Sequence, residues 1–175
     1  KRLKNSSTSP LAQIIDLEEL QKAVDKTEKF DIVEKTKKLC FGDSHSFSMY
    51  QPGYMTSRND GLTLYSVLRD GLKDKILEKS GINSEDLTHL TFYAGNIDIR
   101  HHLCRREDYS KAVEVMVLYL ADQINCLNIK NIELVHALPI EDESRKLPKT
   151  GYYKDTPFHG TWEQRSEVVK IFNKT

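Results

Sequence analysis

Three short apolar runs, separated by longer stretches with helical periodicity, constrain the fold of this chain most strongly. The runs lie at residues 39–41, 87–94 and 132–138. They are rich in the branched and aromatic residues that strands favour, and polar or glycine residues end the first two of them. Strands that alternate with helices form parallel βαβ units with right-handed crossovers. We therefore predict an α/β fold, namely a three-layer α/β/α sandwich with a mostly parallel, flavodoxin-like sheet.

Apolar periodicity predicts the helices. We expect them near residues 10–29, 63–79 and 107–127, with a last helix that begins at the capping box Thr161-x-x-Gln164. Residues 46–60, 99–106 and 140–158 are predicted to be irregular connections. A complete sheet of this type needs four or five strands, so we expect at least one strand that the pattern does not reveal.

Composition indicates one globular domain. Of 175 residues, 38% are hydrophobic, and 26 basic side chains balance 26 acidic ones. We place the domain at residues 10–175, behind a mobile basic arm at residues 1–9. Zero net charge gives no reason to expect a nucleic acid as partner, and no apolar run is long enough to span a membrane. The sequence does not specify an oligomeric state.

Two features bear on the compartment. Cys40, Cys104 and Cys126 are an odd number of cysteines without metal-site spacing, and the positions of Cys40 in a strand and Cys126 on a helix favour buried reduced thiols. We therefore expect a cytoplasmic protein. A sequence that opens on Lys1 is also what a fragment of a longer chain, or a chain after signal-peptide removal, would present.

Polar side chains follow the predicted strands at their carboxyl ends, where parallel sheets bind ligands. Residues 43–45 (Asp-Ser-His) follow the first strand and residues 96–100 (Asn-Ile-Asp-Ile-Arg) follow the second, while Asp155 and His159 precede the last helix. A serine is unreactive until an imidazole takes its proton, and a carboxylate orients that imidazole. These residues therefore predict a site for nucleophilic acyl transfer.

Four short blocks resemble those of the SGNH/GDSL hydrolase family, in the same order and over residues 37–172. They are Gly42-Asp43-Ser44, Asn59-Asp60-Gly61-Leu62-Thr63, Gly95-Asn96-Ile97-Asp98, and Asp155 with His159. The resemblance implies Ser44 as nucleophile, His159 as general base and Asp155 as its orienting carboxylate. It also implies an oxyanion hole made by Gly61 and Asn96, and no cofactor.

The third block continues to His102 and resembles a divergent SGNH-like subgroup, in which Gly-x-Ile-Asp-x-Arg-x-His accompanies Gly-Asp-Ser-His. This resemblance implies that five further side chains bind substrate: Asp43, His45, Asp98, Arg100 and His102. Arg100 would hold a carboxylate or phosphate as a fork, and Asp98 would orient Arg100 or His45. His45 or His102 would then be candidates to replace His159 as the base.

Three features depart from the family pattern. His45 follows the serine where the family has leucine or a similar residue, and Asn96 follows Gly95 directly instead of after one intervening residue. Asp155 and His159 are spaced four apart rather than three, with Pro157 between them.

The expected reaction is hydrolysis or transfer of a small acyl ester of a carbohydrate or similar polar carrier, through an acyl-Ser44 intermediate. A first alternative is a metal-dependent phosphoesterase that uses Asp43, His45, Asn96 and His159, although the sequence has no Gly-Asp-x-x-Asp block between them. A second is a catalytically inactive SGNH-like module that binds a small polar ligand at the same edge of the sheet.

Overall fold

The computed structural model describes residues 38–175. The basic arm predicted at residues 1–9 and the helix predicted near 10–29 lie outside the described residues.

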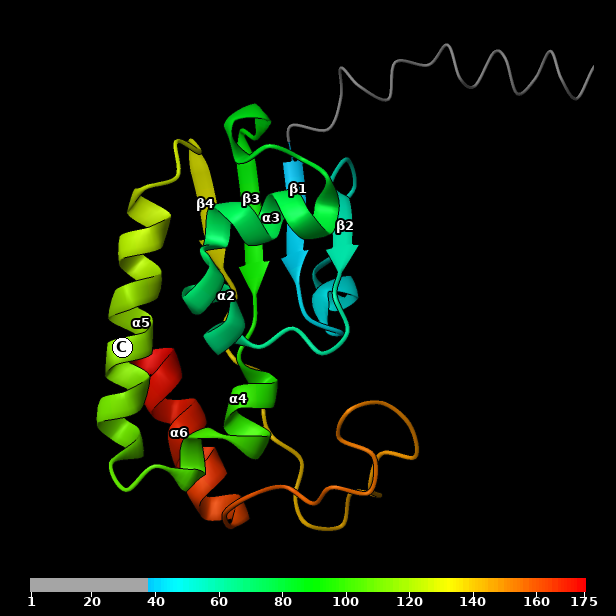
Figure 1. The fold of residues 1–175 in the computed structure, drawn as a ribbon, viewed down its shortest axis with the longest axis vertical. Coiled ribbons are helices and arrows are strands. Elements are labelled where there is room, and N and C mark those ends of the chain that lie inside the picture. The colour runs from blue at the N-terminus through cyan, green and yellow to red at the C-terminus, as the bar shows by residue number, and fades with distance from the viewer. Residues whose placement is uncertain (1–37) are drawn as a thin grey trace, which may run out of the picture. The chain divides into compact units, whose positions relative to one another are not determined.

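Four parallel strands form the sheet, in the order β2-β1-β3-β4. The inner strands are β1 (Lys38–Gly42) and β3 (His89–Tyr93), and the edge strands are β2 (Met55–Arg58) and β4 (Asn131–Leu134). Because every pair is parallel, all four carboxyl ends lie at one edge of the sheet, which is the lower edge in Figure 1.

The strands at 39–41 and 87–94 are confirmed as β1 and β3, and β4 ends at Leu134 rather than at 138. The strand that the pattern did not reveal is β2, inside the connection predicted to be irregular and preceded by a short 3-10 helix, η1 (Ser46–Met49). It is an edge strand with only Ser57 buried, so it lacks the apolar run that marks an inner strand.

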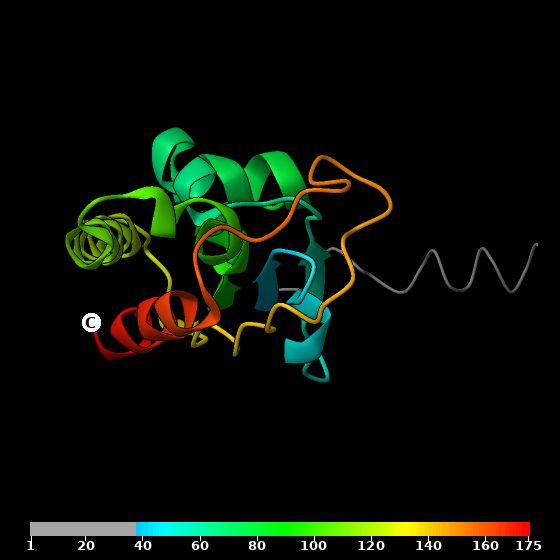
Figure 2. The same cartoon turned by 90° about the horizontal axis from the view of Figure 1, so that it is seen from below.

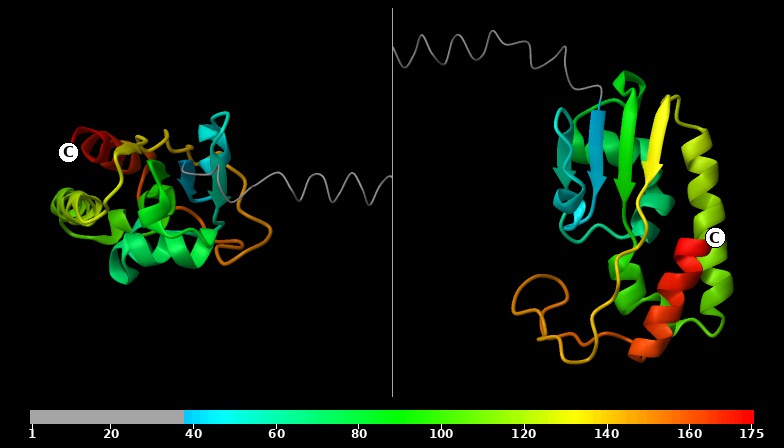
Figure 3. Two further views of the ribbon diagram at one scale, coloured as in Figure 1. Left: turned by 90° about the horizontal axis from the view of Figure 1, so that it is seen from above. Right: turned by 180° about the vertical axis from the view of Figure 1, so that it is seen from behind.

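Helices flank the sheet, as the predicted α/β/α architecture requires. Helices α2 (Leu64–Asp70) and α3 (Leu72–Ser80) cover one face, and α6 (Trp162–Lys174) lies on the opposite side (Figure 2 and Figure 3). The long helix α5 (Tyr109–Asn125) runs beside β4 (Figure 1). The capping box of α6 is formed, because Thr161 and Gln164 bond each other's backbone N–H.

The helix predicted over 63–79 is two helices. Gly71 separates them with φ 93° and ψ 128°, a conformation that only glycine adopts readily. Beyond α3, Gly81 closes the helix in the left-handed conformation, with φ 71°, and a 3-10 turn η2 (Ser84–Asp86) leads to β3.

The prediction of an irregular connection at residues 99–106 is also wrong. This part of the chain holds α4 (Asn96–His101) and the 3-10 helix η3 (Leu103–Arg105). Two apolar residues four positions apart, Ile99 and Leu103, are the signal that a helix lies here, and both are buried. The many cations of this segment obscured that signal.

Two apolar clusters make up the core of the described residues. The larger one joins the sheet to α2 and α3 and includes Leu39, Phe41 and Leu90. The smaller one lies beyond the carboxyl ends of the strands and joins α4, α5 and α6, with Ile99 and Val168 fully buried. This second cluster fixes α4 at the lower edge of the sheet, where its polar residues meet the turn that follows β1.

The three cysteines are free. Cys40 is buried as predicted, whereas Cys126 is exposed just after α5, so its predicted burial is wrong. Within residues 38–175, no helix combines the length and the apolar character needed to cross a membrane.

Candidate functional site

The turn after β1 holds a buried carboxylate against a histidine. Asp43 is fully buried, and its Oδ1 accepts the backbone N–H of His45 at 2.8 Å and lies 3.0 Å from the Nδ1 of that ring. Burial raises the pKa of Asp43, an effect that its contacts with His45 partly offset. Gly42 lets β1 approach β3 closely just before this turn, since a Cβ there would clash with the Tyr93 carbonyl oxygen.

Ser44 is half-buried, and its Oγ lies 3.5 Å from the Nδ1 of His45. The Nδ1 of His45 lies within hydrogen-bond distance of both the Asp43 carboxylate and the Ser44 hydroxyl. An ionised carboxylate can only accept, so an Nδ1–H that donates to Asp43 leaves Nε2 as the ring nitrogen able to accept a proton. That nitrogen has no hydrogen-bond partner in the described part of the chain.

The second block lies directly beside the first. Asn59 donates its backbone N–H and its Nδ2 to the carbonyl of Gly42, at 3.0 and 3.1 Å. Two residues later Gly61 turns the chain with φ 84° and is exposed. The backbone N–H expected to serve the oxyanion hole thus belongs to a turn that is tied to the end of β1.

Asn96 begins α4 with its side chain buried. Its Oδ1 accepts the Tyr93 hydroxyl at 2.6 Å, and the Tyr93 ring also packs edge-on against His45. The Nδ2 of Asn96 is buried and finds no acceptor among the described residues. The Oδ2 of Asp43 is likewise buried without a donor among the described residues.

Asp98 connects the third block to the second. Its buried carboxylate accepts the backbone N–H groups of Leu64 at 2.7 Å and Tyr65 at 3.1 Å, at the start of α2. Burial raises the pKa of Asp98 to about 6, although these N–H bonds act in the opposite direction. Asp98 therefore holds a helix end, rather than orienting Arg100 or His45 as expected.

The guanidinium group of Arg100 already binds a carboxylate of the chain itself. Its Nε and Nη2 bond the carboxylate of Glu141 at 2.8–3.1 Å, and the guanidinium lies over the ring of Phe158. An external carboxylate or phosphate would have to displace Glu141 from this fork. Sequence reasoning missed Glu141, because nothing in the polar connection distinguishes it from the acids that follow.

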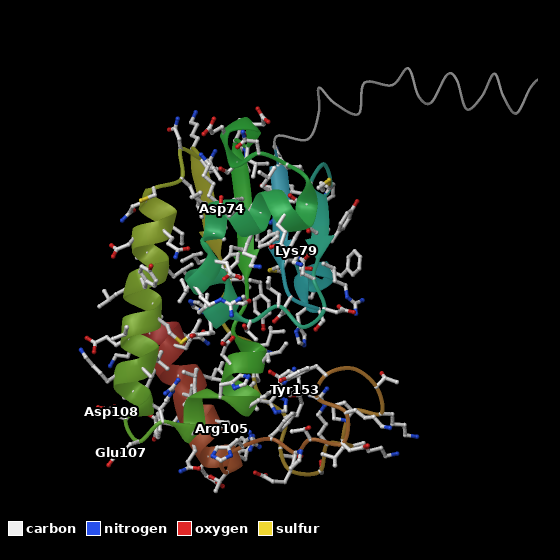
Figure 4. All side chains as sticks on the ribbon, viewed as in Figure 1. Asp74, Lys79, Arg105, Glu107, Asp108 and Tyr153 are labelled. Carbon is white, nitrogen blue, oxygen red and sulfur yellow. The ribbon has the colours of Figure 1, made fainter. Side chains whose placement is uncertain are left out.

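Tyr153 fastens the irregular segment between β4 and α6 to α4. Its hydroxyl lies 2.6 Å from the Nε2 of His102, and its ring stacks on His101 at 4.1 Å (Figure 4). Burial, aided by nearby cations, lowers the pKa of His101 to about 4 and also lowers the pKa of His102. His102 is thus engaged with a tyrosine of the chain itself.

Asp155 and His159 lie farther along the same segment, and both are exposed. The backbone N–H of His159 donates to the Arg100 carbonyl at 2.8 Å, which brings the last block to the third. Over residues 38–175, however, no hydrogen bond joins Ser44 to His159 or His159 to Asp155. The structure gathers the four blocks at one edge without linking these three side chains, and their role as a triad stays a prediction.

Two further features concern ligands. No group of three or more His, Cys, Asp or Glu side chains in the described ranges is placed to hold a metal ion. A cavity of about 840 Å³ lies between the starts of α2 and α5 and the end of α4. Asp98 and His102, both expected to bind substrate, line it.

Comparisons of this chain with protein-family models, with curated proteins and with solved structures gave no match. The case for a function therefore depends on the geometry of the site.

Proposed function

We propose that the carboxyl edge of the sheet is a reaction centre that hydrolyses or transfers the acyl group of an ester, with Ser44 as the nucleophile. The observation that carries the proposal is a half-buried serine hydroxyl beside a histidine whose Nδ1 lies 3.0 Å from a buried carboxylate. The alcohol part of the ester is a carbohydrate or a similar polar carrier, and the reaction requires no cofactor.

His45 is the base that the geometry favours. Its Nδ1 is committed to Asp43, so the proton of Ser44 passes through one water to the free Nε2. As the Ser44 oxygen bonds to the ester carbon, the buried Asp43 carboxylate stabilises the imidazolium that forms. The imidazolium then protonates the departing alcohol. In the second half of the reaction Nε2 takes a proton from a second water as its oxygen bonds to the acyl carbon, and it gives that proton to the Ser44 oxygen as the bond to the acyl group breaks.

The developing oxyanion needs donors aimed at it, each contributing about 3–4 kcal/mol. Asn96 has the required unused donor, its Nδ2, and the backbone N–H of Gly61 is the second. The Nδ2 group is covered in this structure, so the proposal requires the turn around Ser44 to shift when the substrate oxygen enters.

Active-site labelling tests the nucleophile. A fluorophosphonate probe is expected to label the wild-type chain and to leave Ser44→Ala unlabelled, because only an activated serine attacks phosphorus at neutral pH. Ser48→Ala is the matched control, since this exposed serine lies in the same turn and bonds the His45 carbonyl. Labelling that persists in Ser44→Ala would reject Ser44 as nucleophile.

Two histidine variants test the base. His45→Gln is expected to lower kcat by about 10²–10⁴-fold, the usual contribution of general base catalysis, while His159→Gln keeps most of the activity. The measurement is kcat across pH 5–9 on a chromogenic acetyl ester. The opposite ranking would restore His159, with Asp155, as the working pair.

One alternative has structural support. The missing hydrogen bonds among Ser44, His159 and Asp155 favour a non-catalytic module that binds a small polar ligand at this edge. Such a module would remain unlabelled by the fluorophosphonate, while its melting temperature would rise with sugars or phosphate compounds. Phosphatase activity that requires manganese would instead identify the metal-dependent alternative.

A further inference from the structure

The cavity of about 840 Å³ between α2, α4 and α5 is the feature that carries the further inference. Its walls come from the start of α2 (Thr63, Tyr65), from α4 and η3, and from the first half of α5. Glu107 and Asp108, on its rim, lie at the lower end of α5 (Figure 4).

Most of the surface that lines it is apolar, although polar and charged residues outnumber apolar ones among the residues of its wall. Leu103 is buried at the base, while Ala112 and Met116 are partly buried along α5. Val115 and Tyr65 line the cavity and remain 53% and 57% exposed, which leaves apolar surface without a covering partner in the described residues. This composition suits a ligand with a hydrocarbon body.

The charges at the cavity largely cancel. The basic Arg106 and Lys111 and the acidic Glu107 and Asp108 all line it, and Lys111 is paired with Glu114 at 2.7 Å. Deeper in the wall, the Asp98 oxygens are engaged by backbone N–H groups and His102 by Tyr153. Neither a strongly anionic nor a strongly cationic ligand is favoured, so the expected ligand is neutral.

Two residues of the cavity wall follow closely in the chain on residues of the proposed reaction centre. Thr63 is two residues beyond Gly61, and Asp98 is two residues beyond Asn96. Both chain segments that would supply the oxyanion hole thus continue directly into the cavity wall.

We infer that this cavity binds the acyl chain of the substrate, and that the chain is aliphatic with several carbons, in place of the small acyl group expected from the sequence. The inference rests on the proposed function in naming the ligand as part of an ester. Cavities of about 300–1,000 Å³ usually enclose drug-sized ligands, and each buried methylene favours binding by hydrophobic transfer. A two-carbon acyl group would leave nearly all of this volume unused.

Chain-length preference tests the inference. We expect the wild type to prefer p-nitrophenyl octanoate over the acetate in kcat/KM, and Val115→Trp to lower that octanoate-to-acetate ratio about tenfold, because the indole fills space that methylenes would occupy. Leu118→Trp is the matched control. It adds the same bulk to the same helix, at a residue that is 56% exposed and outside the cavity wall, and should keep the wild-type ratio.

A binding measurement separates this inference from the proposed reaction. Neutral 1-octanol should shift the amide NMR signals of Leu103 and Ala112 in Ser44→Ala, more strongly than 1-butanol does, and should fail to do so in Ser44→Ala/Val115→Trp. If these shifts appear while no ester is hydrolysed, binding of a neutral hydrocarbon chain in the cavity is supported, whereas the proposed reaction is overturned, and with it the naming of that chain as an acyl group. If esters are hydrolysed with equal chain-length preference in wild type and Val115→Trp, the assignment is overturned and the reaction stands.

Discussion

At the scale of single residues, Asp98 has the clearest physical consequence. It holds the first turn of α2 through two backbone N–H groups while almost completely removed from water. Burial raises its pKa to about 6, above the ordinary value near 4. Between these pH values the folded state binds a proton that the unfolded state releases. Asp98 therefore favours folding most below about pH 4, and this contribution is lost as pH rises through 6.

Asp98→Asn removes this titration. Two pKa units correspond to about 3 kcal/mol, so the stability of the variant relative to wild type is expected to rise by up to that amount between pH 4 and pH 7. Urea unfolding at each pH measures the difference. Asp86→Asn makes the same change in net charge at an exposed residue that does not bond the start of α2, and it serves as the control. A difference that stays constant over this range would contradict the raised pKa.

At the scale of elements, the break between α2 and α3 depends on one backbone conformation. Gly71 ends the first helix and begins the second at φ 93°, and a Cβ there would lie 3.4 Å from the Asp74 carboxylate. The bend lets both helices follow the sheet face, with Leu68 and Leu72 buried on either side of it.

Gly71→Ala is expected to destabilise the fold by about 1–3 kcal/mol, because alanine is strained at this positive φ. Thermal unfolding measures the loss. Gly81→Asn provides the comparison, since Gly81 is in the left-handed region at φ 71°, which asparagine tolerates, and a smaller loss is expected there. Equal melting temperatures for Gly71→Ala and wild type would mean that the two helices accommodate the side chain by moving.

Elements with an apolar run or a regular apolar face could be predicted from the sequence. Inner strands β1 and β3 and the long helix α5 are of this kind. The pattern failed at β2, which buries one small polar residue, and at α4, whose two buried apolar residues are masked by cations. The apolar pattern also predicted α2 and α3 as one helix. Both helices cover the same face of the sheet, and only the conformation of Gly71 separates them.

At the scale of the whole molecule, the sequence predicted which blocks would share an edge but not which side chains would pair. The meeting of the first three blocks follows from parallel strands, whose carboxyl ends coincide. The fourth block lies in the irregular segment before α6 and is joined to the third by the bond from the His159 N–H to the Arg100 carbonyl. The pairing of Arg100 with Glu141, and of His102 with Tyr153, joins residues about forty to fifty positions apart through an irregular segment. No local sequence pattern encodes such contacts. The sequence therefore could not predict that Arg100 and His102 are already bonded to other residues of the chain.

The inner position of β1 has a consequence for biosynthesis. Its two neighbours, β2 and β3, both follow it in the chain, and parallel partners cannot be supplied by a tight turn. While a ribosome is making this protein, Leu39 and Phe41 therefore lack the neighbouring strand on one side until Tyr93 has emerged. Non-local pairing of this kind folds slowly, so these apolar residues are open to aggregation until β3 pairs with β1.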